Sequence, residues 1–287
     1  MQQLKGKVAV VTGASRGAGR GIALELGEAG ATVYVTGRSI QGKRSIAKLP
    51  GTIDETAAAI TARGGVGIPV RCDHTVDAEV EALFQRIQQE HDRLDLLVNN
   101  VFGGNERSIE LAPFWQQPLE HWHGMFTAGV RAHIVATRYA MPLMLPHHQG
   151  LIINTTFSDR GKYLDNFFYD LAKHTLVRMA FGMHQDLKAY NIAAVALSPG
   201  FMRTEAVLSH YNTDEQHWQS VPDLQKTETP HYVGRAVVAL ATDVKVMQKS
   251  GNVLTVGELA QEYGFTDIDG RLIPPFTIEP LQAEAIV

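Results

Sequence analysis

The fold of this chain is decided by the stretch VAVVTGASRGAG, which runs from Val8 to Gly19. Its first four residues are apolar and mostly β-branched, which predicts a buried strand. Gly13 then predicts a tight turn, and helical spacing of apolar residues begins at Ile22. A strand, a glycine-rich turn and a helix in this order form the opening unit of many nucleotide-binding α/β proteins, although an ordinary strand–helix turn has the same outline.

Strand and helix patterns alternate along the rest of the chain. We expect strands at 8–11, 31–35, 67–70, 94–98, 151–154, 192–197 and 252–256. We expect helices at 22–30, 53–63, 76–92, 119–145, 168–189 and 231–242. Such alternation predicts parallel strands with right-handed crossovers and helices on both faces. The fold class is therefore α/β, a doubly wound parallel sheet of the Rossmann type with about seven strands in one domain, 1–287.

Two stretches interrupt the alternation, at 39–51 and at 205–229. Long irregular segments in compact domains are often functional, so we interpret 205–229 as a substrate loop. Trp218 lies in this loop and is a candidate to line a substrate pocket. The alternative for both stretches is a plain surface insertion. Residues 258–287 are expected to form a carboxyl-terminal tail.

The composition excludes several classes of protein. The chain has 287 residues, 45% of them hydrophobic, and a formal net charge of -4, which gives a nucleic-acid partner no support. Its one cysteine, Cys72, allows no intramolecular disulfide and fits a reducing compartment. We see no apolar signal core and no run long enough to span a membrane, so a cytoplasmic location is expected. The 12 histidines show no zinc-ligand spacing, and no metal is expected.

The glycine-rich turn is the first candidate for cofactor binding. Glycines let the backbone approach a pyrophosphate closely, and the following helix offers free N–H groups and the positive end of its dipole. The spacing differs from G-x-G-x-x-G, because here one glycine is followed by three residues, a glycine, one residue and a glycine. The candidate contacts are Gly13, Ser15, Arg16, Gly17 and Gly19.

The end of the second predicted strand indicates which dinucleotide binds. NAD-binding sites place an acidic residue there to accept a hydrogen bond from the ribose 2′-hydroxyl. This chain has Thr36-Gly37-Arg38-Ser39 instead. An arginine pairs with a 2′-phosphate, and Arg16 could supply a second cation. We therefore predict NADP(H) as the cofactor; the alternative is that Arg38 is an ordinary surface arginine.

The candidate catalytic pair is Tyr169 and Lys173. They are four residues apart at the start of a predicted helix, so they share a face. A nearby ammonium favours the phenolate and lowers a tyrosine pKa from about 10, which makes an acid/base usable near neutral pH. The spacing alone is common by chance.

The pieces together resemble the classical short-chain dehydrogenase/reductase family over nearly the whole chain, in the family's order. The matching pieces are Thr12-Gly13 with Gly17 and Gly19, Asp73, Asn99-Asn100, Tyr169 with Lys173, and the segment from Pro199 to Thr204. The resemblance implies that Asp73 and His74 flank the adenine and that Asn99 and Asn100 shape the cofactor cleft. It implies that Pro199, Gly200, Met202 and Thr204 bind the cofactor, with Thr204 and the backbone near Met202 holding the nicotinamide carboxamide, and that Lys173 also binds the nicotinamide ribose.

The chain departs from the family pattern at three places. Val101-Phe102-Gly103 follows the asparagine pair where the family has Ala-Gly. Gly129 stands where the family usually carries a catalytic asparagine, so Arg131 or His133 is a candidate for the proton relay. The sequence Thr155-Thr156-Phe157-Ser158 stands where the family has a serine pair. Spacing to Tyr169 favours Thr156 as the hydroxyl that orients a carbonyl, whereas residue type favours Ser158. The segment 129–131 and the ending 262–267 resemble the branch of dehydrogenase/reductase member one.

The interpretation of the sequence is an NADP(H)-dependent oxidoreductase. It would transfer a hydride between nicotinamide and a small carbonyl or alcohol substrate, with Tyr169 as acid/base. One alternative is a non-catalytic NADP(H)-binding sensor or scaffold, because Gly129 and the displaced serine leave the active site degenerate. Another is an epimerase or dehydratase, which needs a sizeable carboxyl-terminal substrate domain.

A homodimer or homotetramer is also expected. Related proteins pair through two long helices, here 119–145 and 168–189. The second of these helices is apolar around much of its circumference, and a symmetric partner is the commonest cover for such a surface. The alternative is that the chain's own tail covers it.

Overall fold

A computed structural model describes residues 2–43, 49–104, 112–158 and 161–278. Its centre is a seven-stranded sheet in the order β3-β2-β1-β4-β5-β6-β7, with every neighbouring pair parallel. The strands are β1 (Val8–Val11), β2 (Thr32–Gly37), β3 (Val66–Arg71), β4 (Leu96–Asn99), β5 (Gly150–Thr155), β6 (Ile192–Ser198) and β7 (Val253–Thr255). The predicted doubly wound sheet is therefore confirmed. The order reverses between β1 and β4, where such sheets open a crevice at the carboxyl ends of the strands.

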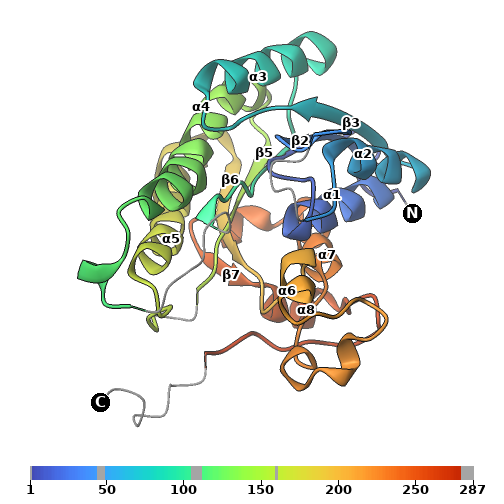
Figure 1. Ribbon diagram of the computed structural model, residues 1–287. Coiled ribbons are helices and arrows are strands. Elements are labelled where there is room, and N and C mark those ends of the chain that lie inside the picture. Colours follow the sequence, from blue (N-terminus) through green and yellow to red (C-terminus); the bar gives the residue numbers. More distant parts are fainter. Residues whose placement is uncertain (1, 44–48, 105–111, 159–160, 279–287) are drawn as a thin grey trace.

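Helices cover both faces of the sheet (Figure 1). One layer contains α1 (Gly17–Glu28), α2 (Ile53–Ala62), α7 (Pro230–Thr242) and α8 (Val256–Tyr263), whose apolar residues share one core with the sheet. The other contains α3 (Asp77–His91), α4 (Ala132–Met144) and α5 (Phe167–Leu187), of which α3, α4 and the end of α5 share a second core. Because both faces are buried, β1, β4 and β6 are continuous apolar runs rather than alternating ones.

Helices α1 and α7 pack closely because glycines face their contact. A Cβ added to Gly21 would lie 2.0 Å from the Pro230 carbonyl oxygen, and one added to Gly234 would lie 2.6 Å from Cγ of Glu25. The side chains nearby add a polar link, since His231 Nδ1 lies 2.6 Å from a Glu25 carboxylate oxygen. This contact fixes α1, and with it the glycine-rich turn that precedes it, relative to the last third of the chain.

The predicted helix 119–145 is not one regular helix. Its middle, His123–Arg131, is π-helical, and α4 begins only at Ala132. Wider helical turns of this kind are frequent at functional sites. The apolar periodicity of the sequence does not separate the two forms, because a π-helical turn still places apolar residues on one face.

Two segments that the sequence predicted as irregular contain helices. The loop 205–229 begins with α6 (Glu205–His210), and Thr204 caps that helix through its hydroxyl. The tail 258–287 begins inside α8, which Thr255 caps in the same way. Both helices are short, so they give too little periodicity to be found from the sequence. Of the irregular stretch 39–51, residues 44–48 lie outside the described residues.

No helix in the described ranges is long and apolar enough to cross a membrane. Within those same ranges, no group of three or more His, Cys, Asp or Glu side chains could hold a metal ion.

Candidate active site

A cavity of about 440 Å³ opens at the carboxyl ends of the strands. We call it the central cavity. Its walls come from the segments that follow β1, β2, β3, β4, β5 and β6, together with the first turns of α5 and α6. Most of the predicted site residues line it, namely Gly13, Ser15, Arg16, Gly17, Arg38, Asp73, His74, Asn100, Thr156, Tyr169, Lys173, Pro199, Gly200, Met202 and Thr204. Three predicted site residues, Gly19, Asn99 and Ser158, are not among the lining residues.

The glycine-rich turn has the backbone that its sequence predicts. Gly13 and Gly17 have φ of 68° and 55°, a region that residues with a Cβ rarely adopt. Gly19 contributes by close packing, because an added Cβ would lie 2.4 Å from the Gly13 carbonyl oxygen and 2.5 Å from the Asn100 side chain. The turn is thus a cradle of bare backbone against which a pyrophosphate can fit.

The first turn of α1 already holds a negatively charged group. Glu205, the first residue of α6, accepts a hydrogen bond from the Gly17 backbone N–H with its carboxylate, at 2.8 Å. This carboxylate stands in for an anion at the positive end of the α1 dipole. The donor set therefore fits the phosphates of a dinucleotide, which would have to take the place of Glu205.

Two arginines lie on the wall formed by the end of β2. Arg16 donates hydrogen bonds to the Ser39 hydroxyl at 3.1 Å and to the Gly51 carbonyl at 3.0 Å, so it ties the glycine-rich turn to the segment after β2. Arg38 is more than a third exposed and lies 4.0 Å from an Asp73 carboxylate oxygen. Burial works to raise the pKa of Asp73, but hydrogen bonds from Thr75 and the charge of Arg38 together hold it below its usual value.

His74 is the buried neighbour of Asp73 on the wall of the cavity. Its Nε2 lies 2.7 Å from the hydroxyl of Thr36, and burial lowers the pKa of its imidazole to about 4. His74 is therefore neutral near pH 7. Its Nδ1 is buried and has no hydrogen-bond partner among the described residues.

The two predicted asparagines have different surroundings. Asn100 lines the cavity and donates through its side chain to the Thr12 and Gly13 carbonyls, at 3.0 and 3.2 Å. Asn99 is fully buried and donates to the hydroxyl of Thr137 and to the side-chain oxygen of Asn154, both at 3.0 Å. Asn99 therefore joins β4 to β5 and α4 from behind the cavity and does not face a ligand.

Tyr169 and Lys173 both line the cavity from one face of α5. Asn166 caps this helix by accepting the Tyr169 backbone N–H at 3.0 Å, which sets the position of the tyrosine in the first turn. Burial raises the pKa of the Tyr169 phenol and lowers the pKa of Lys173 to about 8. Burial alone accounts for the raised pKa of Tyr169, so the lowering expected from the ammonium is not found in the cofactor-free protein, and the phenol is protonated near pH 7.

Thr156 lines the cavity, but its hydroxyl already has an acceptor. It donates to the Lys173 backbone carbonyl at 2.7 Å and is buried. Ser158 lies outside the lining, and its backbone N–H donates to the Ser198 hydroxyl at 3.0 Å. Placement in the cavity therefore favours Thr156 over Ser158 as the hydroxyl that meets a substrate, once its proton is released from the Lys173 carbonyl.

The two candidates for a substitute proton relay do not line the cavity. Arg131 forms a two-point ion pair with Asp77 of α3, at 2.6 Å for each contact. His133 is buried and donates from Nε2 to the Val101 carbonyl at 3.0 Å, and burial lowers the pKa of its imidazole to about 3. His133 thus supports the segment after β4 from behind the cavity.

Aromatic side chains to which the sequence assigned no role form part of the cavity wall. Phe102, Phe157 and Phe276 line it, and the rings of Phe157 and Phe276 lie 5.5 Å apart. Phe157 also lies 6.5 Å from the Tyr169 ring. No linear pattern connects residues 157 and 276, so only the folded chain shows that the tail reaches the cavity.

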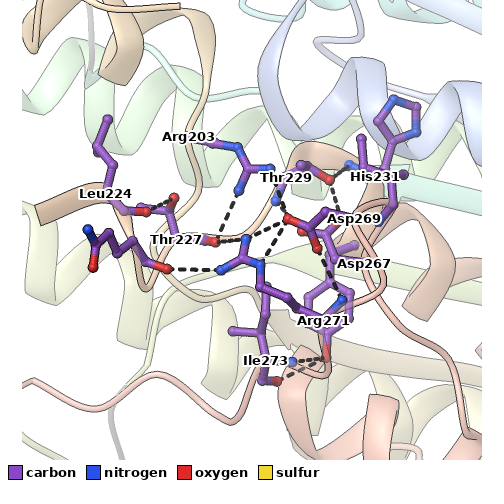
Figure 2. Close-up of polar contacts among 12 residues, drawn as sticks. Arg203, Leu224, Thr227, Thr229, His231, Asp267, Asp269, Arg271 and Ile273 are labelled. Carbon is purple, nitrogen blue, oxygen red and sulfur yellow. Dashed lines mark hydrogen bonds and ion pairs between the residues drawn. The ribbon is translucent and has the colours of Figure 1, made fainter. Parts of the chain in front are cut away.

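The tail is held against the loop 205–229 by two arginines (Figure 2). Arg203 and Arg271 both donate to the Thr227 carbonyl, at 3.1 and 2.9 Å, and both pair with Asp269. Both guanidinium groups also lie over the ring of Trp218, at 4.0 and 5.1 Å from its centroid. Trp218 is 7% exposed and is not a lining residue, so the expectation that it lines the pocket is wrong.

Comparisons with known proteins identify the family and the fold. The family model described as short chain dehydrogenase matches residues 7–215. The mouse protein dehydrogenase/reductase SDR family member 1 is 37% identical over 281 residues, which cover 95% of this chain and 87% of that protein.

Two solved structures share the fold. A short chain dehydrogenase from Mycobacterium thermoresistibile has a TM-score of 0.80 at 24% identity, with 96% of this chain and 95% of that chain covered. A 7α-hydroxysteroid dehydrogenase in complex with NADH and 7-oxo glycochenodeoxycholic acid has a TM-score of 0.71 at 24% identity, with 88% and 94% covered.

Proposed function

The chain belongs to the short-chain dehydrogenase family, and we propose that it is an NADP(H)-dependent oxidoreductase acting on a carbonyl/alcohol pair with Tyr169 as acid/base. The observation that carries this proposal is the meeting of two parts in one cavity. The glycine-rich turn with Arg38 forms one part of the wall, and Tyr169 with Lys173 forms another. These two parts lie more than 100 positions apart in the sequence, and the sheet brings them together.

The ionisation of Tyr169 suits the reductive direction. Since burial raises its pKa, the phenol carries a proton that it can donate to a carbonyl oxygen as that oxygen gains charge. Lys173, with a pKa of about 8, is mostly charged near pH 7 and stabilises a phenolate once the proton has left. When bound, NADPH supplies the hydride. Thr156 orients the carbonyl oxygen when its hydroxyl turns away from the Lys173 carbonyl.

The preference for NADP(H) over NAD(H) is supported by the charges near the end of β2. Arg38 and Arg16 line the cavity there, and Thr36 and Gly37 stand where an NAD-binding site carries an acid. A 2′-phosphate would pair with Arg38 and would be repelled by a carboxylate at the strand end. Asp73 also lines the cavity, and its charge is balanced by Arg38, 4.0 Å away.

The substrate that fits the cavity is a small molecule with an apolar part. Phe157 and Phe276 provide an apolar part of the wall near Tyr169. We therefore place the carbonyl at Tyr169 and the apolar part of the substrate against Phe157 and Phe276.

One observation favours a second function, a dinucleotide-binding sensor without turnover. The Thr156 hydroxyl is committed to the backbone of Lys173, and no side chain at Gly129 can carry a proton relay. Such a protein would bind NADPH in the same cavity and leave carbonyl compounds unchanged.

The experiment that separates the two functions is NADPH oxidation over a panel of apolar aldehydes and ketones, with NADH in parallel. We expect turnover with NADPH for at least one apolar ketone and its loss in Tyr169→Phe. Tight NADPH binding by calorimetry without turnover across the panel would support the sensor instead.

A further inference from the structure

The ring of Phe102 lies directly under the ammonium of Lys173. Nζ of Lys173 is 4.1 Å from the centroid of this ring, closer than the 5.5 Å that separates it from the Tyr169 ring. The Phe102 ring also meets the Tyr169 ring edge to face, at 5.8 Å between centroids and 77° between planes. One aromatic side chain therefore touches both members of the candidate catalytic pair.

The position of this ring depends on two glycines. A Cβ added to Gly129 would lie 2.9 Å from Cδ2 of Phe102, and one added to Gly104 would lie 2.3 Å from its Cζ. Neither glycine has a positive φ, so neither is required by its own backbone. Their common effect is to leave room for the ring, and a side chain at 129 would occupy part of the volume that the ring fills.

We propose that Phe102 is a positioning residue that holds the ammonium of Lys173 on its ring face, beside the hydroxyl-bearing ring of Tyr169. The inference rests on the proposed function, because it assigns a role to a neighbour of the same pair. A ring face is negative in potential and bears no net charge, so it stabilises a buried ammonium without neutralising it. The cation thus stays available to the phenolate that forms on proton transfer.

The groups around Lys173 leave the stabilisation of its ammonium to the Phe102 ring. Lys173 is 8% exposed, and burial, which lowers its pKa, is the one cause resolved for that shift. The titratable groups near it are Tyr169, which burial keeps protonated, and His133 of α4, which burial keeps neutral. Asp73 and Glu205 line the same cavity; Asp73 is engaged with Arg38, and Glu205 with the backbone of Gly17.

The test measures the ionisation of Lys173 in the cofactor-free, full-length protein. Lysine labelled with ¹³C at Cε reports the titration by NMR, and the signal is assigned by its absence in Lys173→Arg. Because removal of the ring destabilises the charged form, we expect the pKa of Lys173 to fall by about one unit in Phe102→Leu. Incorporation of 3,4,5-trifluorophenylalanine at 102 keeps the shape and weakens the ring face, and we expect a fall of about half a unit.

The control is Phe157→Leu, which removes another ring of the same cavity wall that also adjoins Tyr169. It should leave the pKa of Lys173 within about 0.2 units of its original value. A folded trifluorophenylalanine variant with an unchanged pKa would overturn the proposal and assign Phe102 to packing alone. Since no cofactor or substrate is present, this result does not depend on whether the protein reduces carbonyl compounds.

Discussion

Arg38 and Tyr169 carry two separable parts of the proposed function, cofactor choice and proton transfer. Each lies on the wall of the central cavity, and each depends on one polar group that a single substitution removes. Their effects should therefore appear in different measurements, one in binding and one in turnover.

Replacement of Arg38 by alanine should remove the preference for NADPH. We expect the original protein to bind NADPH at least about tenfold more tightly than NADH, which corresponds to about 1.4 kcal/mol. Arg38→Ala should bind the two cofactors about equally, because the guanidinium that pairs with the 2′-phosphate is gone. Calorimetric titration with both cofactors measures this, and Arg63→Ala, outside the cavity lining, serves as the control. Equal affinities in the original protein, or a preserved preference in Arg38→Ala, would contradict the assignment.

Replacement of Tyr169 by phenylalanine should separate chemistry from cofactor binding. It deletes only the hydroxyl that donates the proton, and general acid catalysis is worth roughly 10²- to 10⁴-fold in rate. We expect kcat to fall by about that factor while the Kd of NADPH stays nearly constant. Tyr139→Phe, which removes a hydroxyl that is 3.4 Å from Glu81, should retain the original rate. If Tyr169→Phe kept more than about a tenth of the rate, another group would be the acid.

At the residue scale, the sequence predicted those parts of the site that depend on spacing within one element. Tyr169 and Lys173 share a helix, and the glycines of the turn lie within a few residues of one another. The position of the Phe102 ring could not be predicted, because it depends on the space left by Gly129. The contact of Phe276 with Phe157 could not be predicted either, because it joins distant segments. The exclusion of Trp218 from the cavity has the same origin, since Arg203 and Arg271 approach it from different segments.

At the element scale, the tail residues 267–276 act on the loop 205–229 through Arg271. This side chain donates to the carbonyls of Gln225 and Thr227 and pairs with Asp269, while about a third of it stays exposed. The tail continues from this point to Phe276 at the cavity. Loss of the contacts that Arg271 makes should therefore affect both the stability of the fold and the shape of the cavity wall at Phe276.

Replacement of Arg271 by alanine should lower the free energy of unfolding by about 1–2 kcal/mol, because the carbonyl of the buried Thr227 loses one of its charged donors and Asp269 loses an ion-pair partner. Urea denaturation followed by circular dichroism measures the change. Arg86→Ala breaks an exposed pair with Glu90 on α3 and should cost less than about 0.5 kcal/mol. If the free energy of unfolding fell as little in Arg271→Ala as in the control, the contacts of Arg271 would not stabilise the fold.

The elements themselves were predictable where their periodicity is long. All seven strands and the longer helices were found from the sequence. Helix α1 begins earlier than the apolar spacing indicates, because Gly17 and Gly19 have no apolar side chain that would contribute to this spacing. The π-helical segment His123–Arg131 was not found, since its hydrogen-bond pattern depends on packing against α5 and the segment after β4.

At the scale of the whole molecule, α5 exposes an apolar stripe. Phe167, Leu171 and Phe181 lie along it and are 37%, 43% and 40% exposed. Leu176, by contrast, is 1% exposed, so a charge there would disrupt the core rather than test an interface. The described tail runs to Phe157 and to Lys162, which donates to the Ile278 carbonyl, rather than along the length of α5.

We therefore predict a homodimer or homotetramer that buries the α5 stripe. Leu171→Asp with Phe181→Asp should yield monomers in sedimentation velocity at about 20 µM protein, because two charges would be buried without partners. Val244→Asp changes a side chain that is 96% exposed and should leave the assembly intact. A monomer formed by the original protein at this concentration would refute the prediction.

The contact between Glu205 and Gly17 makes α6 a tethered competitor of the cofactor. We expect the carboxylate, while it occupies the first turn of α1, to exclude a phosphate, so that the apparent affinity for the cofactor is reduced in proportion to the fraction of molecules in which the site is open. Linkage requires the reverse effect as well, so a bound dinucleotide must loosen the start of the loop 205–229. Glu205→Gln should bind NADPH several-fold more tightly by calorimetry, whereas Glu81→Gln on α3 should not. Unchanged affinity in Glu205→Gln would mean that the carboxylate leaves at no cost, and that cofactor binding and loop movement are independent events.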